Sequence, residues 1–363
     1  MQRRPVRASP MVMRTFSGHD HPCVVPAKAL SPPEPNIVRR LYECYYLSDT
    51  PVQQAPLLSS HWEYFSRQFA VEIDETGRPC ALRGAGFGAL EARRTPIEWL
   101  LSVVVMASQL ALTPNRGDIV RLVRPALRVC RAARLHFSFQ AFRQVADLSV
   151  IVRHLSTIIR TTRPLIIINI GDGYGFLSAL IKRVLPEARL VLVDLGKTLL
   201  FQAVTCQAVH PTSTHHVVLP AQLSNQPDWM ASEFIYCPAE YLEELDQFVF
   251  DIGINIASMQ EMNTATIERY FSFLRRHLRP DSNLFYCVNR EVKDLRGGER
   301  TVFDAYPWSP RDRHLVDGYV PWRNRFAILP ASVRSRKLGA YLPLVNSPRK
   351  PMRMRLTVLA TEP

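Results

Sequence analysis

The sequence lacks the features that mark disulfide-rich or zinc-binding proteins. Its seven cysteines are scattered over 363 residues, their number is odd, and no two form a C-x-x-C pair. A disulfide framework or a zinc knuckle needs cysteines that are paired and regularly spaced. The pattern argues against both and is typical of free thiols in a reducing compartment, so we expect a cytoplasmic protein.

Long hydrophobic runs are also missing. The longest, Trp99–Leu112, is too short to span a bilayer and contains Ser102, Ser108 and Gln109, which favours a buried core helix. The first 33 residues hold several prolines and arginines but no apolar stretch of the kind that a secretory signal has. We therefore expect no membrane span, and we interpret residues 1–33 as a disordered tail.

Acidic residues are scarce relative to basic ones. The chain has 32 Asp and Glu against 45 Lys and Arg, which gives a formal net charge of +13. An arginine-covered surface would account for this charge, and so would attraction to an anionic substrate or a nucleic acid. Four arginines fall on one face of a predicted helix over Asp118–Leu135: Arg121, Arg124, Arg128 and Arg131.

This arginine face is interpreted first as a solvated surface, with Val123, Leu127 and Cys130 toward the other side of the helix. The functional alternative is that it receives phosphate or another anion. No aromatic residues alternate with the arginines as they do on surfaces that bind single-stranded nucleic acid. We therefore expect a small-molecule acceptor, anionic or neutral, and no nucleic-acid partner.

What the sequence does contain is a strand, a glycine turn and a helix in succession. Leu165–Ile170 is an apolar, β-branched run typical of a central parallel strand. It ends in a turn with glycines at 171, 173 and 175, after which Phe176–Leu185 has helical spacing. A second strand, Leu190–Asp194, ends on an acidic residue at about the distance where such a residue binds a ribose hydroxyl pair. The stretch predicts half of a nucleoside-binding βαβ fold.

The spacing of the glycines favours one kind of nucleoside over another. A dinucleotide fingerprint reads G-x-G-x-x-G, and its third glycine lets the helix approach closely while the helix N-terminus holds a pyrophosphate. Here the turn reads G-x-G-x-G, and Phe176 stands where that glycine would fall. Its ring argues against a pyrophosphate and favours S-adenosylmethionine (SAM), which has no phosphate. A nicotinamide or flavin site, or a turn with incidental glycines, is the alternative. The predicted cofactor-binding residues are Asn169, Gly171, Gly173, Gly175, Asp194, Leu195 and Asn255.

Beyond Pro164, strands and helices alternate strictly. The predicted strands are Leu165–Ile170, Leu190–Asp194, Glu233–Cys237, Phe248–Asn255 and Asn283–Asn289. The predicted helices are Phe176–Leu185, Lys197–Ala208, Ala239–Leu245 and Asn263–Leu278. This order implies an α/β fold with a doubly wound, Rossmann-like sheet. Met352–Ala360 alternates like a closing antiparallel edge strand, which a SAM-dependent fold adds to the Rossmann plan.

Residues 34–163 show helical patterns only. We therefore predict three parts: a tail over residues 1–33, an all-helical cap over 34–163, and a Rossmann-like SAM-binding methyltransferase domain over 164–363.

Asn255–Met262, NIASMQEM, is the most distinctive motif of the chain. With the IGDGYG turn and the DLGKTL segment that begins at Asp194, it resembles the sugar O-methyltransferase family of bacterial glycan and natural-product pathways. That resemblance covers about residues 164–326 and implies SAM-dependent transfer of a methyl group to a hydroxyl of a sugar or a glycosylated natural product. The chain departs from the family pattern at Asn169, where an acidic residue is usual, and at Gly196 and Lys197, which replace Pro and Glu.

Methyl transfer to a hydroxyl needs a general base within hydrogen-bond reach, because a hydroxyl is a poor nucleophile at neutral pH. Glu261, just past the fourth strand, is the carboxylate best placed by sequence, and we predict it to be this base. A carboxylate paired with the helix start or with an arginine is the other interpretation. The predicted substrate-binding residues are Ser258, Asn289, Arg290, Tyr306 and Trp308. Core packing is the alternative for the tryptophan.

Two questions stay open at this point. No cluster of carboxylates demands a metal, and no metal ligand is assigned, although Asp251, Glu261 and Asp304 could meet in space. The acceptor could also be a non-sugar peptide or polyketide. A non-catalytic protein that binds SAM or S-adenosylhomocysteine (SAH) is a further alternative, suggested by Asn169 and Gly196.

Overall fold

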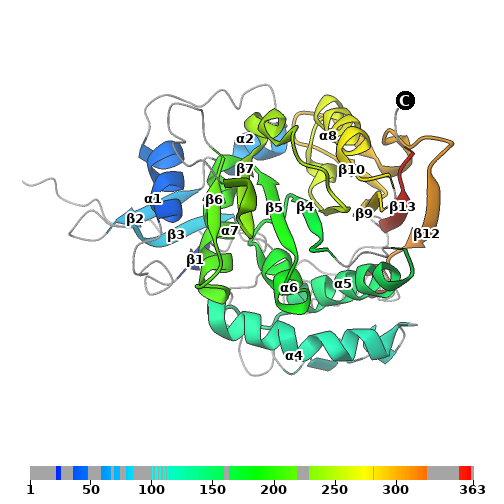
Figure 1. Ribbon diagram of the computed structural model, residues 1–363, viewed down its shortest axis with the longest axis horizontal. Coiled ribbons are helices and arrows are strands. Elements are labelled where there is room, and N and C mark those ends of the chain that lie inside the picture. Colours follow the sequence, from blue (N-terminus) through cyan, green and yellow to red (C-terminus); the bar gives the residue numbers. More distant parts are fainter. Residues whose placement is uncertain are drawn as a thin grey trace, which may run out of the picture.

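The computed structural model describes the chain from strand β1 to strand β13 with several gaps (Figure 1). The described residues are 22–25, 36–47, 59–66, 69–73, 79–85, 100, 103–104, 106–107, 109–111, 113, 115–158, 163–218, 229–280, 282–324 and 351–360.

The centre of the molecule is an eight-stranded sheet in the order β12-β13-β9-β8-β4-β5-β7-β6. Its strands are β4 (Ile166–Ile170), β5 (Arg189–Asp194), β6 (His215–Val217), β7 (Phe234–Pro238), β8 (Ile252–Ile256), β9 (Leu284–Arg290), β12 (Arg313–Tyr319) and β13 (Met352–Val358). Six neighbouring strands of this sheet, β9-β8-β4-β5-β7-β6, pair in parallel, so their carboxyl ends lie at the same edge. The predicted α/β fold class is confirmed.

Helices cover both faces of this sheet because both faces of its central strands are apolar. Ile167 of β4 packs into a core with α5 (Phe139–Ile158), α6 (Phe176–Val184) and α7 (Gly196–Val209). Ile168 packs into a second core with α8 (Thr264–His277) and the 3-10 helix Ala239–Leu245. Each central strand thus sends alternate side chains into two cores.

Helix α4 (Arg116–Ala133) forms an outer layer over α5, α6 and α7 (Figure 1). Its four arginines are exposed, as both a solvated face and an anion-binding face require. Leu127, expected on the other side of the helix, is 47% exposed. The helical period places Ala126 and Val129 inward.

Strand β13 is antiparallel to its neighbours, as predicted, but it is not the edge strand. It lies between β9 and β12, and β12 forms the edge. The segment before it supplies this edge: β10 (Val292–Asp294) and β11 (Arg300–Val302) form a hairpin, and β12 follows. We had no prediction for these three strands, because they are short or carry polar residues at most positions.

The N-terminal region is not all-helical, contrary to expectation. It contains a three-stranded antiparallel sheet of β1 (Pro22–Val25), β3 (Pro79–Ala85) and β2 (Ala70–Ile73). Strand β1 also lies within residues 1–33, which we expected to be a tail; the rest of that tail lies outside the described residues. Strands β1 and β2 have only four residues each, and β3 contains both a proline and a glycine, so none of them shows enough alternation to be recognised in a sequence.

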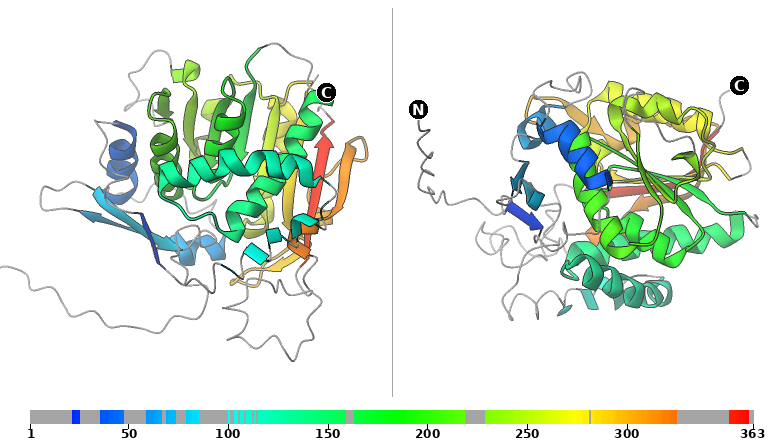
Figure 2. Two further views of the ribbon diagram at one scale, coloured as in Figure 1. Left: turned by 90° about the horizontal axis from the view of Figure 1, so that it is seen from below. Right: turned by 60° about the vertical axis from the view of Figure 1, so that its left-hand side comes forward.

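Two helical segments accompany this small sheet. Helix α1 (Asn36–Tyr42) continues into a π-helical turn, Glu43–Leu47, and contacts α7. Helix α2 (Ser60–Ser66) lies at the end of the main sheet where the parallel strands finish (Figure 2, left). Ser59 Oγ donates a hydrogen bond there to the carbonyl of Glu261. Nowhere in the described ranges is a helix both long and apolar enough to cross a membrane.

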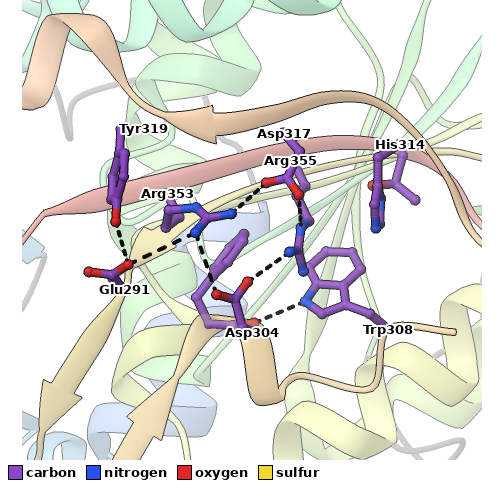
Figure 3. A network of polar contacts seen from close by, with 10 residues as sticks. Glu291, Asp304, Trp308, His314, Asp317, Tyr319, Arg353 and Arg355 are labelled. Atoms are coloured by element: carbon purple, nitrogen blue, oxygen red, sulfur yellow. Dashed lines mark hydrogen bonds and ion pairs between the residues drawn. The ribbon is translucent and has the colours of Figure 1, made fainter. Parts of the chain in front are cut away.

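Ion pairs fix the outer strands to the rest of the sheet (Figure 3). Arg353 Nη2 of β13 lies 2.7 Å from Asp317 Oδ1 of β12, and Arg355 Nη2 lies 2.7 Å from Asp304 Oδ1 in the turn after β11. The outermost member is Glu291, whose Oε1 accepts a 2.6 Å hydrogen bond from Tyr319. The network links β12, β13 and the β10–β11 hairpin.

We expect the protein to lose stability steeply below about pH 4. Burial alone would raise the pKa of Asp312, but hydrogen bonds from Arg275 and from two backbone N–H groups lower it below its usual range. Asp251 and Asp317 have lowered pKa values for a similar reason. A carboxylate with a depressed pKa stabilises the fold above its unfolded pKa, and this stabilisation is lost as pH falls through the folded pKa.

Thermal melting between pH 7 and pH 3 tests this expectation. The control is Asp312→Asn, which leaves Arg275 buried without its carboxylate and should cost about 3–5 kcal/mol at pH 7. This variant should also lose stability less steeply below pH 4. Equal slopes for the two proteins would contradict the assignment.

Candidate cofactor and acceptor site

The glycine turn after β4 is packed tightly on both sides. Gly171, Gly173 and Gly175 all have positive φ, which favours glycine. A Cβ on Gly171 would lie 2.1 Å from Ser258 Oγ, and one on Gly175 would lie 2.8 Å from the Cα of Gln202 in α7. The third glycine therefore brings α6 close to α7, although it stands one position earlier than in a dinucleotide fingerprint.

Asp172 fills the N-terminus of α6 with its own carboxylate. Its Oδ2 accepts a 2.8 Å hydrogen bond from the backbone N–H of Ser178, and the N–H of Leu177 also contributes. Burial raises the pKa of Asp172 to about 6, although these hydrogen bonds oppose the shift. Because an anion already takes the place of a pyrophosphate at this helix start, the turn does not fit a dinucleotide. Asp172 is not among the residues predicted from the sequence to form the site.

Asp194 lies beside this turn at the end of β5. Its oxygens accept hydrogen bonds from the N–H of Leu195 at 2.8 Å and from Gln202 Nε2 at 2.6 Å, and the N–H of Gly173 also donates to it. Burial, with the negative charge of Asp172 nearby, raises the pKa of Asp194 to about 7 against these hydrogen bonds. A partly exposed carboxylate at a strand end next to a glycine turn can accept hydrogen bonds from a ribose.

Asn169 is buried in β4 beneath the turn. Its Nδ2 donates a 3.0 Å hydrogen bond to Ser178 Oγ, and its amide oxygen accepts no hydrogen bond from the described residues. That oxygen can accept a hydrogen bond from a ligand amino group, although it lacks the charge of the usual acidic residue. The predicted cofactor contact of Asn169 stays a prediction.

The first helical segment covers the loop that follows Asp194. The ring of Tyr45 packs on Gly196, where a Cβ would lie 2.1 Å from Tyr45 Cε1, and its hydroxyl donates a 2.9 Å hydrogen bond to Glu240. Tyr46 Oη donates to the carbonyl of Lys197 at 3.0 Å. The absence of a side chain at Gly196 therefore makes room for the ring of Tyr45. Leu195, just before this glycine, is the N-cap residue of α7.

The predicted site residues Asn255, Ser258 and Asn289 form a buried polar network. Asn255 Nδ2 donates to the carbonyl of Ile170 at 2.9 Å, and its Oδ1 accepts from Asn289 Nδ2 at 2.8 Å. Asn289 Oδ1 in turn accepts from the N–H of Gln260 at 3.0 Å. These side chains join the ends of β4, β8 and β9, so they position the glycine turn. Their direct contacts with cofactor or acceptor stay predictions.

Glu261 is held by two basic side chains. Its Oε1 lies 2.6 Å from Lys293 Nζ, and its Oε2 lies 3.4 Å from His61 Nε2 of α2. Burial alone would raise the pKa of Glu261, but the hydrogen bond from His61 and the charge of Lys293 lower it to about 2. A carboxylate with so low a pKa accepts a proton poorly at neutral pH. It can instead orient the imidazole of His61, which the sequence analysis did not select.

The remaining predicted substrate residues lie in two different places. Arg290 ends β9 at the edge where the parallel strands finish, close to Glu261. Tyr306 and Trp308 instead pack in an aromatic cluster on the face of the sheet that α8 covers. The ring centroid of Trp308 lies 6.1 Å from that of Phe285, near the start of β9. The structure therefore brings Arg290 to the site and leaves the two aromatic residues in the core.

The three carboxylates considered for a metal do not meet. Asp251 precedes β8 and binds Arg163, Glu261 follows β8, and Asp304 belongs to the outer ion-pair network. Within the described part of the chain, no three His, Cys, Asp or Glu residues are grouped as metal ligands.

Comparisons with known proteins return methyltransferases among solved structures. A proposed sarcosine dimethylglycine methyltransferase from Galdieria sulphuraria is 10% identical, with 60% of this chain and 88% of that chain covered and a TM-score of 0.41. Haemonchus contortus phosphoethanolamine N-methyltransferase 2, solved with SAH, is 12% identical, with 62% of this chain and 60% of that chain covered and a TM-score of 0.37. A proposed O-methyltransferase from Klebsiella pneumoniae is 14% identical, with 73% of this chain and 100% of that chain covered and a TM-score of 0.35.

The sheet order and the inserted antiparallel strand agree with the predicted fold. The chain has an α/β fold with a mostly parallel sheet and one antiparallel strand inserted next to its edge. No family profile and no curated protein matches the sequence. The function is therefore argued from the site residues.

Proposed function

We propose that this protein is a SAM-dependent O-methyltransferase that acts on a hydroxyl of a sugar or a glycosylated natural product. The observation that carries the proposal is the pair of carboxylates at the glycine turn. Asp172 fills the helix N-terminus, and Asp194 lies at the end of the next strand. This arrangement suits a nucleoside without a pyrophosphate and does not suit a dinucleotide.

The residues at the turn fit the parts of SAM. Asp194 would hold the ribose hydroxyls, the amide oxygen of Asn169 would accept from the amino group, and the backbone of Gly171–Gly175 would lie against the methionine part. SAM supplies an electrophilic methyl group on a sulfonium. The NIASMQEM resemblance and the Asn255–Asn289 network support the sugar O-methyltransferase assignment within this class.

His61 and Glu261 provide the proton chemistry in this proposal. The acceptor hydroxyl would donate its proton to His61, and Glu261 would orient the ring and stabilise its protonated form. Lys293 holds Glu261 in place at 2.6 Å. The predicted role of Glu261 as the base itself is thus replaced by a positioning role, because its pKa is about 2.

Calorimetric titration with SAH, NAD and NADP tests the cofactor assignment. We expect the protein to bind SAH and neither dinucleotide. Asp194→Asn should bind SAH about 10- to 100-fold more weakly, because hydrogen bonds to a charged group are lost. Its melting temperature should be retained, because the asparagine oxygen can still accept the hydrogen bond from the N–H of Leu195.

The matched control is Asp246→Ala, which removes an exposed carboxylate that pairs with His277. It should bind SAH like the unsubstituted protein. Binding of NAD or NADP in place of SAH would overturn the proposal. Binding of SAH that is unaffected by Asp194→Asn would overturn the assignment of the ribose contact.

A further inference from the structure

A cluster of arginines lies under the acceptor side of the site. Arg143 comes from α5, Arg290 ends β9, and Arg323 belongs to the short helix α9 (Pro321–Asn324). Arg143 and Arg323 are each only 7% exposed. One carboxylate, that of the fully buried Asp147, lies among them.

Both carboxylate oxygens of Asp147 already have partners other than Arg143 and Arg290. Its Oδ2 lies 2.7 Å from Arg323 Nη2, and its Oδ1 accepts hydrogen bonds from Tyr286 Oη at 3.0 Å and Trp322 Nε1 at 3.1 Å. Asp147 therefore balances Arg323 and offers no oxygen to another guanidinium.

Arg143 has no comparable partner. Its guanidinium rests 4.0 Å above the ring of Phe139, and its buried Nε makes no hydrogen bond within the described residues. Burial, together with the positive charges of Arg323 and Arg290, holds the pKa of Arg143 well below its usual range, and Asp147 offsets only part of this effect. A buried charge without a partner is unfavourable, so it needs another explanation.

Arg290 is in a similar position. Its backbone N–H donates to Gln260 at 2.7 Å, but its side chain makes no hydrogen bond or ion pair with the described residues. Glu261 is near, but its oxygens face Lys293 and His61. Glu261 is balanced by Lys293, so among the described residues the three guanidinium groups face one further carboxylate, that of Asp147. This leaves an excess of two positive charges in the cluster.

We propose that Arg143, Arg290 and Arg323 bind the phosphoryl group of a phosphorylated sugar acceptor, either a sugar phosphate or a nucleotide-linked sugar. The proposal rests on the proposed function and names the class of its acceptor. The two excess charges match a phosphate dianion, and planar guanidinium groups bind phosphate oxygens in pairs. A carboxylate carries only one charge. The exposed arginine face of α4 lies outside this site.

The placement also orients the acceptor. Arg290 is the last residue of β9, and Glu261 with His61 lies just beyond the end of β8 beside it. When the arginines bind the phosphoryl group, the attached sugar ring would point toward His61. The phosphoryl group would thus serve as the anchor, while the hydroxyl to be methylated faces the base.

Calorimetric titrations with glucose 1-phosphate, UDP-glucose, glucuronate and glucose test the proposal. We expect at least one of the two phosphorylated compounds to bind and neither glucuronate nor glucose to bind comparably. Preference for glucose 1-phosphate identifies a free sugar phosphate, and preference for UDP-glucose identifies a nucleotide-linked sugar. Equal binding of glucuronate, or no binding of either phosphorylated compound, would overturn the proposal.

Substitutions separate binding from folding. Arg143→Met and Arg290→Met should each weaken the phosphorylated ligand about 10- to 100-fold, because a charge-assisted hydrogen bond is lost. The matched control, Arg121→Met, removes an arginine whose side chain is 85% exposed on α4 and should leave binding unchanged. Without ligand, Arg143→Met should melt no lower than the unsubstituted protein, because it removes an unpaired buried charge.

A lower melting temperature of Arg143→Met would show that the arginine is structural and would overturn the proposal. Titration of the same preparations with SAH distinguishes the two levels of inference. SAH binding without phosphate-dependent acceptor binding would overturn the anion site alone. If the unsubstituted protein does not bind SAH, the proposed function itself is contradicted.

Discussion

Replacement of His61 by asparagine should lower kcat for methyl transfer about 10²- to 10⁴-fold, which is the usual contribution of a general base. His61 contacts Glu261 from a helix that docks on the end of the sheet, and its imidazole side chain is only 18% exposed. Asparagine keeps the size and polarity of the side chain but cannot accept the proton. SAH binding, measured by calorimetry, should stay unchanged because His61 lies on the acceptor side.

His314→Asn is the control for this experiment. His314 lies on β12, where its Nδ1 is 2.8 Å from Thr357 Oγ1, and it takes no part in the site. Its loss should leave kcat close to that of the unsubstituted protein. If His61→Asn also retains kcat, another group must accept the proton, and the role of His61 is refuted.

Glu261→Gln tests the positioning role separately. Glutamine keeps a hydrogen bond to His61 but removes the charge that stabilises the protonated ring, so kcat should fall less than in His61→Asn. KM for the acceptor should change little, because Glu261 acts through His61 and not on the acceptor itself. A kcat equal to that of the unsubstituted protein would indicate that Glu261 supports only the fold.

Gly171→Ala should cost about 2–5 kcal/mol of stability and lower the melting temperature by about 5–15 °C. Two effects add here. Gly171 has a φ of 79°, which alanine adopts only under strain, and the new Cβ would lie 2.1 Å from Ser258 Oγ. Ser258 cannot easily move away, because its hydroxyl donates to the carbonyl of Ile170 at 3.1 Å.

Gly298→Ala isolates the first of these effects. Gly298 has a φ of 90° but has nothing within 4 Å of the position of a Cβ. This variant should therefore cost only about 1–2 kcal/mol. Thermal and denaturant unfolding of the two variants compares them directly. Equal losses would show that the contact with Ser258 is relaxed without cost, contrary to the packing described here.

The central sheet was predictable because local patterns determine it. The predicted strand Leu165–Ile170 is observed as Ile166–Ile170, and the predicted helix Phe176–Leu185 as Phe176–Val184. The apolar run of the strand ends at the glycines, and the helical period begins directly after them. The small N-terminal sheet was missed because two of its strands have only four residues and the third, β3, contains a proline and a glycine.

The site was predictable only where its residues are neighbours in sequence. The glycine turn and Asp194 come from one βαβ unit, and the structure places them together. His61 and Glu261 are 200 positions apart. Arg143 comes near Arg290 because α5 reaches β9, where Asp147 accepts a hydrogen bond from Tyr286 Oη. Tyr306 and Trp308 show the converse, since aromatic residues that suit a sugar also suit a core. Such convergence depends on tertiary packing, which no local pattern records.

The position of β13 has a consequence for how the chain folds during synthesis. Strands β9 and β12 share no hydrogen bonds and are joined only through β13. About 60 residues separate the end of β9 from the start of β13, so at about 5–20 residues per second β9 remains an unpaired edge for about 3–12 s. Open edges of this kind attract other strands. The nascent chain is thus prone to aggregate at this edge until β13 has left the ribosome.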